Sequence, residues 1–131
     1  MRVLLDTSYL YKLMRAQGLI SEMERRFFDT WEARLYVSAV SIWEMRLKFR
    51  AIHPSGERKS PYDPNDVVAA LERQGVTFLT MTARHAACDL ETPIPHEDPF
   101  DELLLVQAQE EGLKLLTDDR RLIGHPLTIT A

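Results

Sequence analysis

The sequence predicts an α/β domain with a mostly parallel central sheet and helices on both of its faces. The order of the predicted elements supports this prediction. Short apolar segments that are typical of strands alternate with segments whose apolar residues have helical spacing, and the alternation runs through the whole chain. Strands and helices that alternate in this way form parallel sheets that the helices cover. The length of 131 residues suits one domain, spanning residues 1–131.

The first half of the chain predicts two strands, each followed by helices. The run RVLLD is short and apolar, as in a buried strand, and RLYVSAV is rich in β-branched and aromatic residues. In order, we expect a strand at Arg2–Asp6, helices at 7–19 and Ser21–Ala33, a strand at Arg34–Val40 and a helix at 41–52. For the last helix, Ser41 fits the N-cap and Glu44 the third helical position of a capping box.

A proline-rich segment, His53–Asp66, separates the two halves and is interpreted as a surface loop within the domain. The helix predicted at 99–112 has the clearest limits, because Asp98 fits its N-cap, Pro99 its first position and Gly112 the residue after its end. In order, the second half predicts a helix at 66–75, a strand at 76–82, helices at 83–91 and 99–112, a strand at 113–117, a short helix at 118–124 and a strand at 127–130.

Composition narrows the class of protein. A net charge of −4, from 16 basic and 20 acidic residues, argues against general nucleic-acid binding through basic excess. It does not exclude a nucleic-acid enzyme, because carboxylates that bind metal offset their own charge. The single cysteine, Cys88, cannot form an internal disulfide, which favours a reducing compartment. No apolar run approaches the roughly 20 residues that span a bilayer, so we expect a cytoplasmic protein without membrane contact.

Acidic residues fall where predicted strands end or where the following helices begin. Asp6 ends the first strand, Glu44 and Asp101 lie one turn into helices, and Asp118 and Asp119 directly follow a strand. The carboxyl ends of parallel strands share one edge of the sheet, so these acids could meet in one pocket. An all-oxygen site suits Mg²⁺ or Mn²⁺, which catalyse phosphodiester hydrolysis. Taken singly, an acid at a helix start is better explained by capping or the helix dipole than by catalysis; the joint pattern favours a site.

Four segments in order, LLDTSYL, SIWEM, HEDPFDELLLVQA and LLTDDRRL, resemble the PIN-domain nucleases, and most closely the VapC-type toxin ribonucleases of toxin–antitoxin pairs. The resemblance covers nearly the whole chain. It implies a PIN-like three-layer α/β/α fold and a four-carboxylate site for Mg²⁺ or Mn²⁺. By position, the metal-binding and catalytic acids would be Asp6, Glu44, Asp101 and Asp119.

Some positions stay open within this resemblance. Asp118 is the alternative to Asp119 as the fourth acid, and Asp98 is interpreted as a helix cap. Relatives with DPFD often continue with arginine, whereas Glu102 here removes a cation and adds an acid near the site. His96 is interpreted as a turn residue in preference to a substrate contact.

The leading hypothesis is a metal-dependent endoribonuclease acting as a toxin. The alternatives are a PIN-like domain that binds RNA or a protein without cutting and, less favoured, a phosphatase or phosphotransferase, for which a phosphate-binding glycine loop is missing. Substrate contacts are expected from Thr7 and Ser8, and from Arg46 and Arg50 on one helix face. The resemblance also implies a homodimer and an antitoxin protein that blocks the site.

Overall fold

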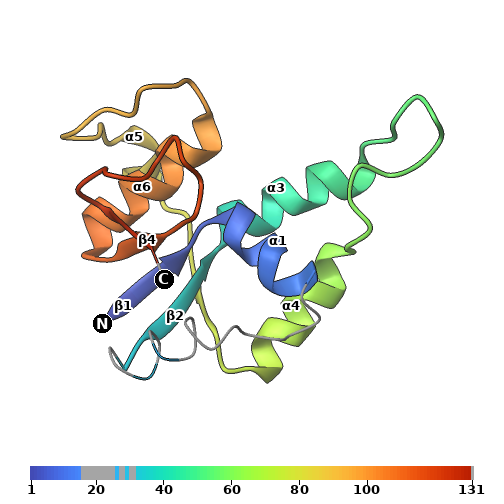
Figure 1. Cartoon of the computed structure of the whole chain (residues 1–131), viewed down its shortest axis with the longest axis horizontal. Coiled ribbons are helices and arrows are strands. Elements are labelled where there is room, and N and C mark those ends of the chain that lie inside the picture. The colour runs from blue at the N-terminus through green and yellow to red at the C-terminus, as the bar shows by residue number, and fades with distance from the viewer. Residues whose placement is uncertain (16–25, 27–28, 30–31, 131) are drawn as a thin grey trace.

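The structure is a computed structural model that describes residues 1–15, 26, 29 and 32–130. Five strands form one sheet in the order β3-β2-β1-β4-β5, and every pairing in it is parallel. The central position of β1 is visible in Figure 1. The strands are β1 (Arg2–Leu5), β2 (Arg34–Ser38), β3 (Thr77–Leu79), β4 (Lys114–Leu116) and β5 (Thr128–Ile129). The prediction of a parallel α/β sheet is confirmed.

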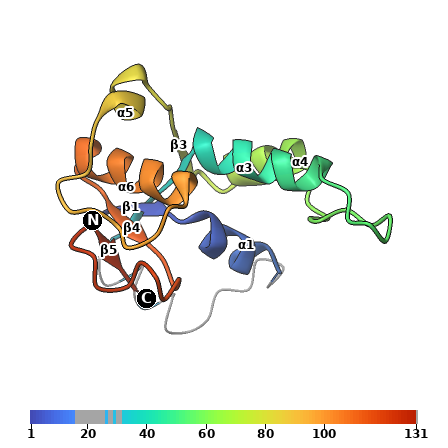
Figure 2. The same cartoon turned by 90° about the horizontal axis from the view of Figure 1, so that it is seen from above.

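Helices cover both faces of the sheet and make three layers (Figures 1 and 2). The described helices are α1 (Thr7–Arg15), α3 (Ala39–Arg50), α4 (Pro64–Arg73), α5 (Ala83–Ala87) and α6 (Pro99–Glu111). Alternate residues of β1 point to opposite faces, as the strand period of two requires. Val3 and Leu5 pack in one core with residues of α1, α3 and α4, and Leu4 packs in the other with residues of α6. In the described ranges, none is both long and apolar enough to cross a bilayer.

Helix α3 begins earlier than the sequence predicted. Its N-cap is Ser38, whose side chain accepts from the Val40 N–H. The expectation of Ser41 as N-cap, with Glu44 in a capping box, is therefore wrong. Ser41 lies fully buried inside the helix, where its hydroxyl accepts from Thr7 Oγ1 at 2.8 Å. This hydrogen bond joins the start of α1 to α3.

The segment predicted as a helix at 118–124 also differs from the expectation. The helix expected at 118–124 is a set of hydrogen-bonded turns, in which the N–H groups of Leu122 and Ile123 both donate to the Asp119 carbonyl. The helix expected at Ser21–Ala33 lies almost wholly outside the described residues.

Helix α6 has the limits that the sequence predicted. The Asp98 side chain accepts from the N–H groups of Phe100 and Asp101, Pro99 is the first helical residue, and Gly112 takes the left-handed conformation with φ 68° that ends the helix. The side chain of Gln107, fully buried in α6, accepts from Ser38 Oγ. That bond fastens α6 to the end of β2, which positions the first turn of α6 at the carboxyl edge of the sheet.

The connection between α3 and α4, residues 51–63, projects from the rest of the molecule (Figures 1 and 2). The chain folds back on itself in this loop, which we call the 51–63 loop, and Ile52 and Arg58 form an antiparallel bridge across it. The Arg58 guanidinium lies 4.3 Å from the ring centroid of Phe49 and donates to the Phe49 carbonyl. The end of the 51–63 loop places Tyr62 against Tyr11 of α1, with their ring centroids 6.0 Å apart.

Candidate active site

Asp6 lies at the centre of the carboxyl edge of the sheet, directly after β1. Its N–H donates to the Leu116 carbonyl of β4, so the neighbouring strand sets its position. One carboxylate oxygen, Oδ2, accepts from Ser8 Oγ at 2.9 Å and from Thr117 Oγ1 at 2.6 Å. The residue is only 2% exposed. These two hydroxyl donors and the burial fix the direction of the Asp6 carboxylate.

A cavity of about 290 Å³ opens at this edge, and acids from separate segments line it. The structure brings together all of the acids that the family resemblance implied, and it adds Asp98. The acids that line the cavity are Asp6, Glu44, Asp98, Asp101 and Asp119, and the other lining residues are Thr7, Ser8, Tyr11, Arg15, Lys48 and Arg121. Asp118 does not line it and instead forms an ion pair of 3.5 Å with Lys12. The geometry therefore favours Asp119 over Asp118 at the fourth position.

Two of these carboxylates are held in an environment that disfavours their charge. Burial raises the pKa of Asp6, and the negative charge of Asp119 adds to the rise, although hydrogen bonds from Thr117 and Ser8 oppose it. Burial also raises the pKa of Asp101, with the charges of Asp6 and Asp119 in the same direction and a hydrogen bond with His96 against it. The three acids are thus close enough to repel one another, which a bound cation would relieve.

Arg121 places a cation among these acids. Its Nη2 atom lies 2.9 Å from Asp119 Oδ2 and 3.5 Å from Asp101 Oδ2. The hydrogen bond from Arg121 lowers the pKa of Asp119, in contrast to the raised values of the two buried acids. The Arg121 side chain is 55% exposed, so it can leave the two carboxylates without breaking the core.

Glu44 and Lys48 form the wall of the cavity on the side of α3. Lys48 Nζ lies 3.3 Å from Glu44 Oε2, one helical turn away. Arg46 and Arg50, expected to contact RNA, line a different cavity beside Trp43 and α4. The structure therefore brings Lys48 to the acids and leaves Arg46 and Arg50 apart from them.

Three further groups at the site were not assigned a role from the sequence. Thr117 donates to Asp6, and its place in the Thr-x-Asp pattern was the available signal. His96 Nε2 lies 2.9 Å from Asp101 Oδ2, from five residues before it in the chain. Arg121 could have been suspected only from its spacing of two after Asp119. Glu102, expected to add an acid near the site, instead lines a separate cavity with Asp89 and Pro93 and others.

The donor set fits a hard divalent cation, because the acids around the cavity offer carboxylate oxygens, which Mg²⁺ and Mn²⁺ prefer. In the described part of the chain, however, no three His, Cys, Asp or Glu side chains form a group that could hold a metal ion as they stand. The Arg121 guanidinium contacts two of the carboxylates. A bound metal ion would compete with Arg121 for Asp101 and Asp119.

Comparison with known proteins defines the class. A family model described as "PIN domain" matches residues 3–125, which is nearly the whole chain. The chain belongs to the PIN-domain family, whose members are generally nucleases. The expectation of a PIN-like fold is confirmed. A search of curated proteins gave no sequence match.

Two solved structures have the same fold over all of this chain. The structure of VapBC2 from Rickettsia felis, bound to a DNA fragment from their promoter, matches with a TM-score of 0.62 and 11% identity and is covered over 98% of its chain. The structure of DNA-bound VapBC from Salmonella typhimurium matches with a TM-score of 0.65 and 17% identity and is covered over 97%. At these identities the likeness concerns the fold.

Proposed function

We propose that this chain is a Mg²⁺- or Mn²⁺-dependent endoribonuclease, the VapC-type toxin of a toxin–antitoxin pair, built as one PIN domain over residues 1–131. The observation that carries the proposal is the meeting of Asp6, Glu44, Asp101 and Asp119 in one cavity at the carboxyl edge of the sheet. Membership of the PIN family supports a nuclease. The two VapBC structures with the same fold support the toxin role.

The proposed roles of the residues follow from their contacts. Asp6, Asp101, Asp119 and Glu44 would hold the metal, which when bound supplies the water activation and charge stabilisation that phosphodiester hydrolysis needs. Ser8 and Thr117 orient the Asp6 carboxylate through their hydroxyls. Thr7 donates to Ser41 of α3 and lines the cavity, so we propose that it supports this wall as well as contacting substrate.

The test is cleavage of RNA by purified protein with Mn²⁺ and with chelator. We expect the protein to cleave RNA in the presence of Mn²⁺ and not in the presence of chelator. Asp6→Asn and Asp101→Asn should each lower the rate by at least about a hundredfold, because the loss of one preorganised charged group in an active site typically costs 2–4 kcal/mol or more. Both variants should keep the fold, as circular dichroism would show. Wild-type rates in either variant would disprove the mechanism.

The neighbouring acids Asp118 and Asp119 supply a matched control. Each changes by one atom when replaced with asparagine, but only Asp119 lines the cavity. We expect Asp119→Asn to lose cleavage and Asp118→Asn to keep it. The opposite result would exchange their roles.

A PIN-like domain that binds without cutting is the second candidate, and the contact of Arg121 with both Asp101 and Asp119 is the observation that favours it. If Arg121 holds these acids permanently, the protein should fail to bind Mn²⁺ in a calorimetric titration and should not cleave RNA. Metal binding with metal-dependent cleavage would reject this candidate.

The proposal includes partners. We propose a homodimer and a cognate antitoxin that covers the acidic cavity, acting in the cytoplasm, where RNA is present and a lone cysteine stays reduced. Co-expression with the small reading frame next to the gene should relieve growth arrest and copurify a complex. An orphan gene with no such neighbour would argue against the toxin role.

A further inference from the structure

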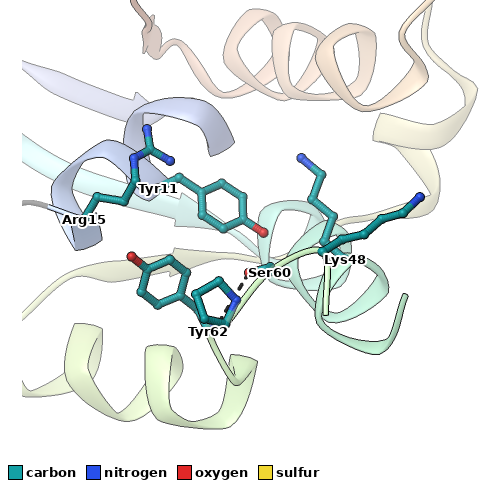
Figure 3. A pocket seen from close by; sticks show the side chains of 7 residues that line it. Tyr11, Arg15, Lys48, Ser60 and Tyr62 are labelled. Atoms are coloured by element: carbon teal, nitrogen blue, oxygen red, sulfur yellow. Dashed lines mark hydrogen bonds between the residues drawn. The ribbon is translucent and has the colours of Figure 1, made fainter. Parts of the chain in front are cut away.

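A second cavity, of about 270 Å³, adjoins the acidic one and has the opposite charge. Its lining residues include three cations and no acid (Figure 3). They come from α1, from α3 and from the 51–63 loop, and they are Tyr11, Arg15, Lys48, Lys59, Ser60, Pro61 and Tyr62. We call this cavity the basic pocket.

The basic pocket and the acidic cavity share one wall. Tyr11, Arg15 and Lys48 line both of them. Lys48 marks the boundary, since its Nζ atom lies 3.3 Å from Glu44 Oε2 and 5.2 Å from the ring centroid of Tyr11. A ligand that extends from the acids along this wall therefore enters a site of positive charge within the same groove.

Tyr11 contributes an unsatisfied group. The residue is only 8% exposed, and no partner for its hydroxyl is present among the described residues. A buried hydroxyl without a partner costs free energy, and an acceptor oxygen of a ligand would satisfy it once the side chains that cover the hydroxyl move aside. Its ring and that of Tyr62, tilted by 48°, add aromatic faces to the pocket.

We propose that the basic pocket binds the backbone phosphate of a nucleotide next to the one cleaved, as a subsite for single-stranded RNA. Cations that neutralise phosphate, beside aromatic rings, are the groups by which proteins hold single strands. The proposal rests on the proposed nuclease function and names residues other than Arg46 and Arg50, which lie in a separate cavity. The cations that would contact phosphate are Arg15, Lys48 and Lys59.

The test is binding of a fluorescent single-stranded oligoribonucleotide in chelator, which prevents cleavage. The variant Arg15→Gln/Lys59→Gln removes two exposed cations of the pocket. We expect roughly tenfold weaker binding, with the slope of log affinity against log salt reduced by about 0.7, since the pocket holds one phosphate and each phosphate neutralised on a single strand contributes about 0.7. Arg46→Gln/Arg50→Gln removes the same charge elsewhere and should leave the slope nearly unchanged.

A second variant tests the hydroxyl. We expect Tyr11→Phe to be no less stable than wild type in urea, because the hydroxyl has no partner to lose, yet to bind the oligoribonucleotide several-fold more weakly. Equal affinity of wild type and the Arg15→Gln/Lys59→Gln variant would overturn the subsite, as would no measurable binding by wild type at low salt. The subsite would also be overturned if the Arg15→Gln/Lys59→Gln variant lost binding to a glutamate-rich peptide but kept the RNA affinity of wild type. That result would make the pocket a contact for protein.

The outcomes separate the two proposals. Protein that binds RNA through the basic pocket but never cleaves it with Mn²⁺ would disprove the nuclease and leave the subsite standing. If the protein cleaves RNA with Mn²⁺, but the Arg15→Gln/Lys59→Gln variant binds RNA as tightly as wild type, only the subsite is disproved.

Discussion

Asp6 is more deeply buried than Asp101, the other buried acid of the site, and this burial disfavours its charge. Its position at the end of β1 was predicted from the sequence, because a lone acid after an apolar run is conspicuous. Arg121 was missed and His96 was interpreted as a turn residue, because an arginine in a turn and a histidine in a proline-rich segment have many available partners. Only the folded placement shows that both reach Asp101, at distances of 3.5 Å and 2.9 Å.

The raised pKa of Asp6 sets a pH dependence of stability for the metal-free protein. A carboxyl group whose folded pKa exceeds its unfolded value near 3.8 stabilises the fold fully below that pH and loses this contribution as the pH rises through the folded value. Asp6→Asn should therefore be more stable than wild type at pH 7 in chelator, by a few degrees in Tm, with the difference shrinking toward pH about 4. Thermal unfolding across this range measures it. A variant less stable than wild type at pH 7 would contradict the direction.

Helix α6 shows how much of an element follows from local sequence. Its two ends were predicted correctly because Asp98, Pro99 and Gly112 each have one strong local preference. The start of α3 was not, because Ser38 and Ser41 are both good caps and local sequence cannot choose between them. The buried hydrogen bond from Thr7 gives Ser41 its other role, and that contact joins residues far apart in the chain.

Helix α6 also gives a prediction at the scale of the element. Asp98→Ala removes the acceptor for the N–H groups of Phe100 and Asp101, and should lower the free energy of unfolding by about 1 kcal/mol in urea. Because the cap holds the turn that presents Asp101, Mn²⁺ affinity should fall as well. Glu102→Ala, an exposed change in the same turn, should stay within about 0.5 kcal/mol. Equal losses in the two variants would argue against the cap.

At the scale of the whole molecule, the alternation of strands and helices was sufficient to predict a parallel sheet. The order of strands, with β1 in the middle and β4 beside it, was not predictable from the pattern. That order depends on which apolar faces pack together across the chain, as in the two cores on either side of β1. Asp6 and Asp119 lie in one cavity because the strands that precede them, β1 and β4, are neighbours in this order.

Metal binding should stabilise the molecule as a whole. A ligand that binds only the folded state adds about 2.7 kcal/mol at a hundredfold excess over its Kd, so Mn²⁺ should raise Tm after chelator treatment. Arg121→Gln should lower the Mn²⁺ concentration that gives half of the Tm increase by roughly tenfold, because it frees two carboxylates. A tenfold change in Kd is equivalent to about 1.4 kcal/mol of binding free energy.

The adjacent Arg120 provides the control for this titration. It is exposed and does not line the acidic cavity, so Arg120→Gln should titrate like wild type. Equal shifts for both arginines would mean that general charge, and not the contact with Asp101 and Asp119, sets the metal affinity.

The order of strands also governs when a newly made chain acquires its site. Asp6 is synthesised early, but its partner hydroxyl on Thr117 and the carboxylate of Asp119 follow β4, which pairs directly with β1. While β4 is still inside the ribosome, β1 has an empty neighbour position and the acids cannot meet. Under the proposed nuclease function, the chain therefore acquires its site only after residues 114–119 have left the ribosome and β4 has paired with β1.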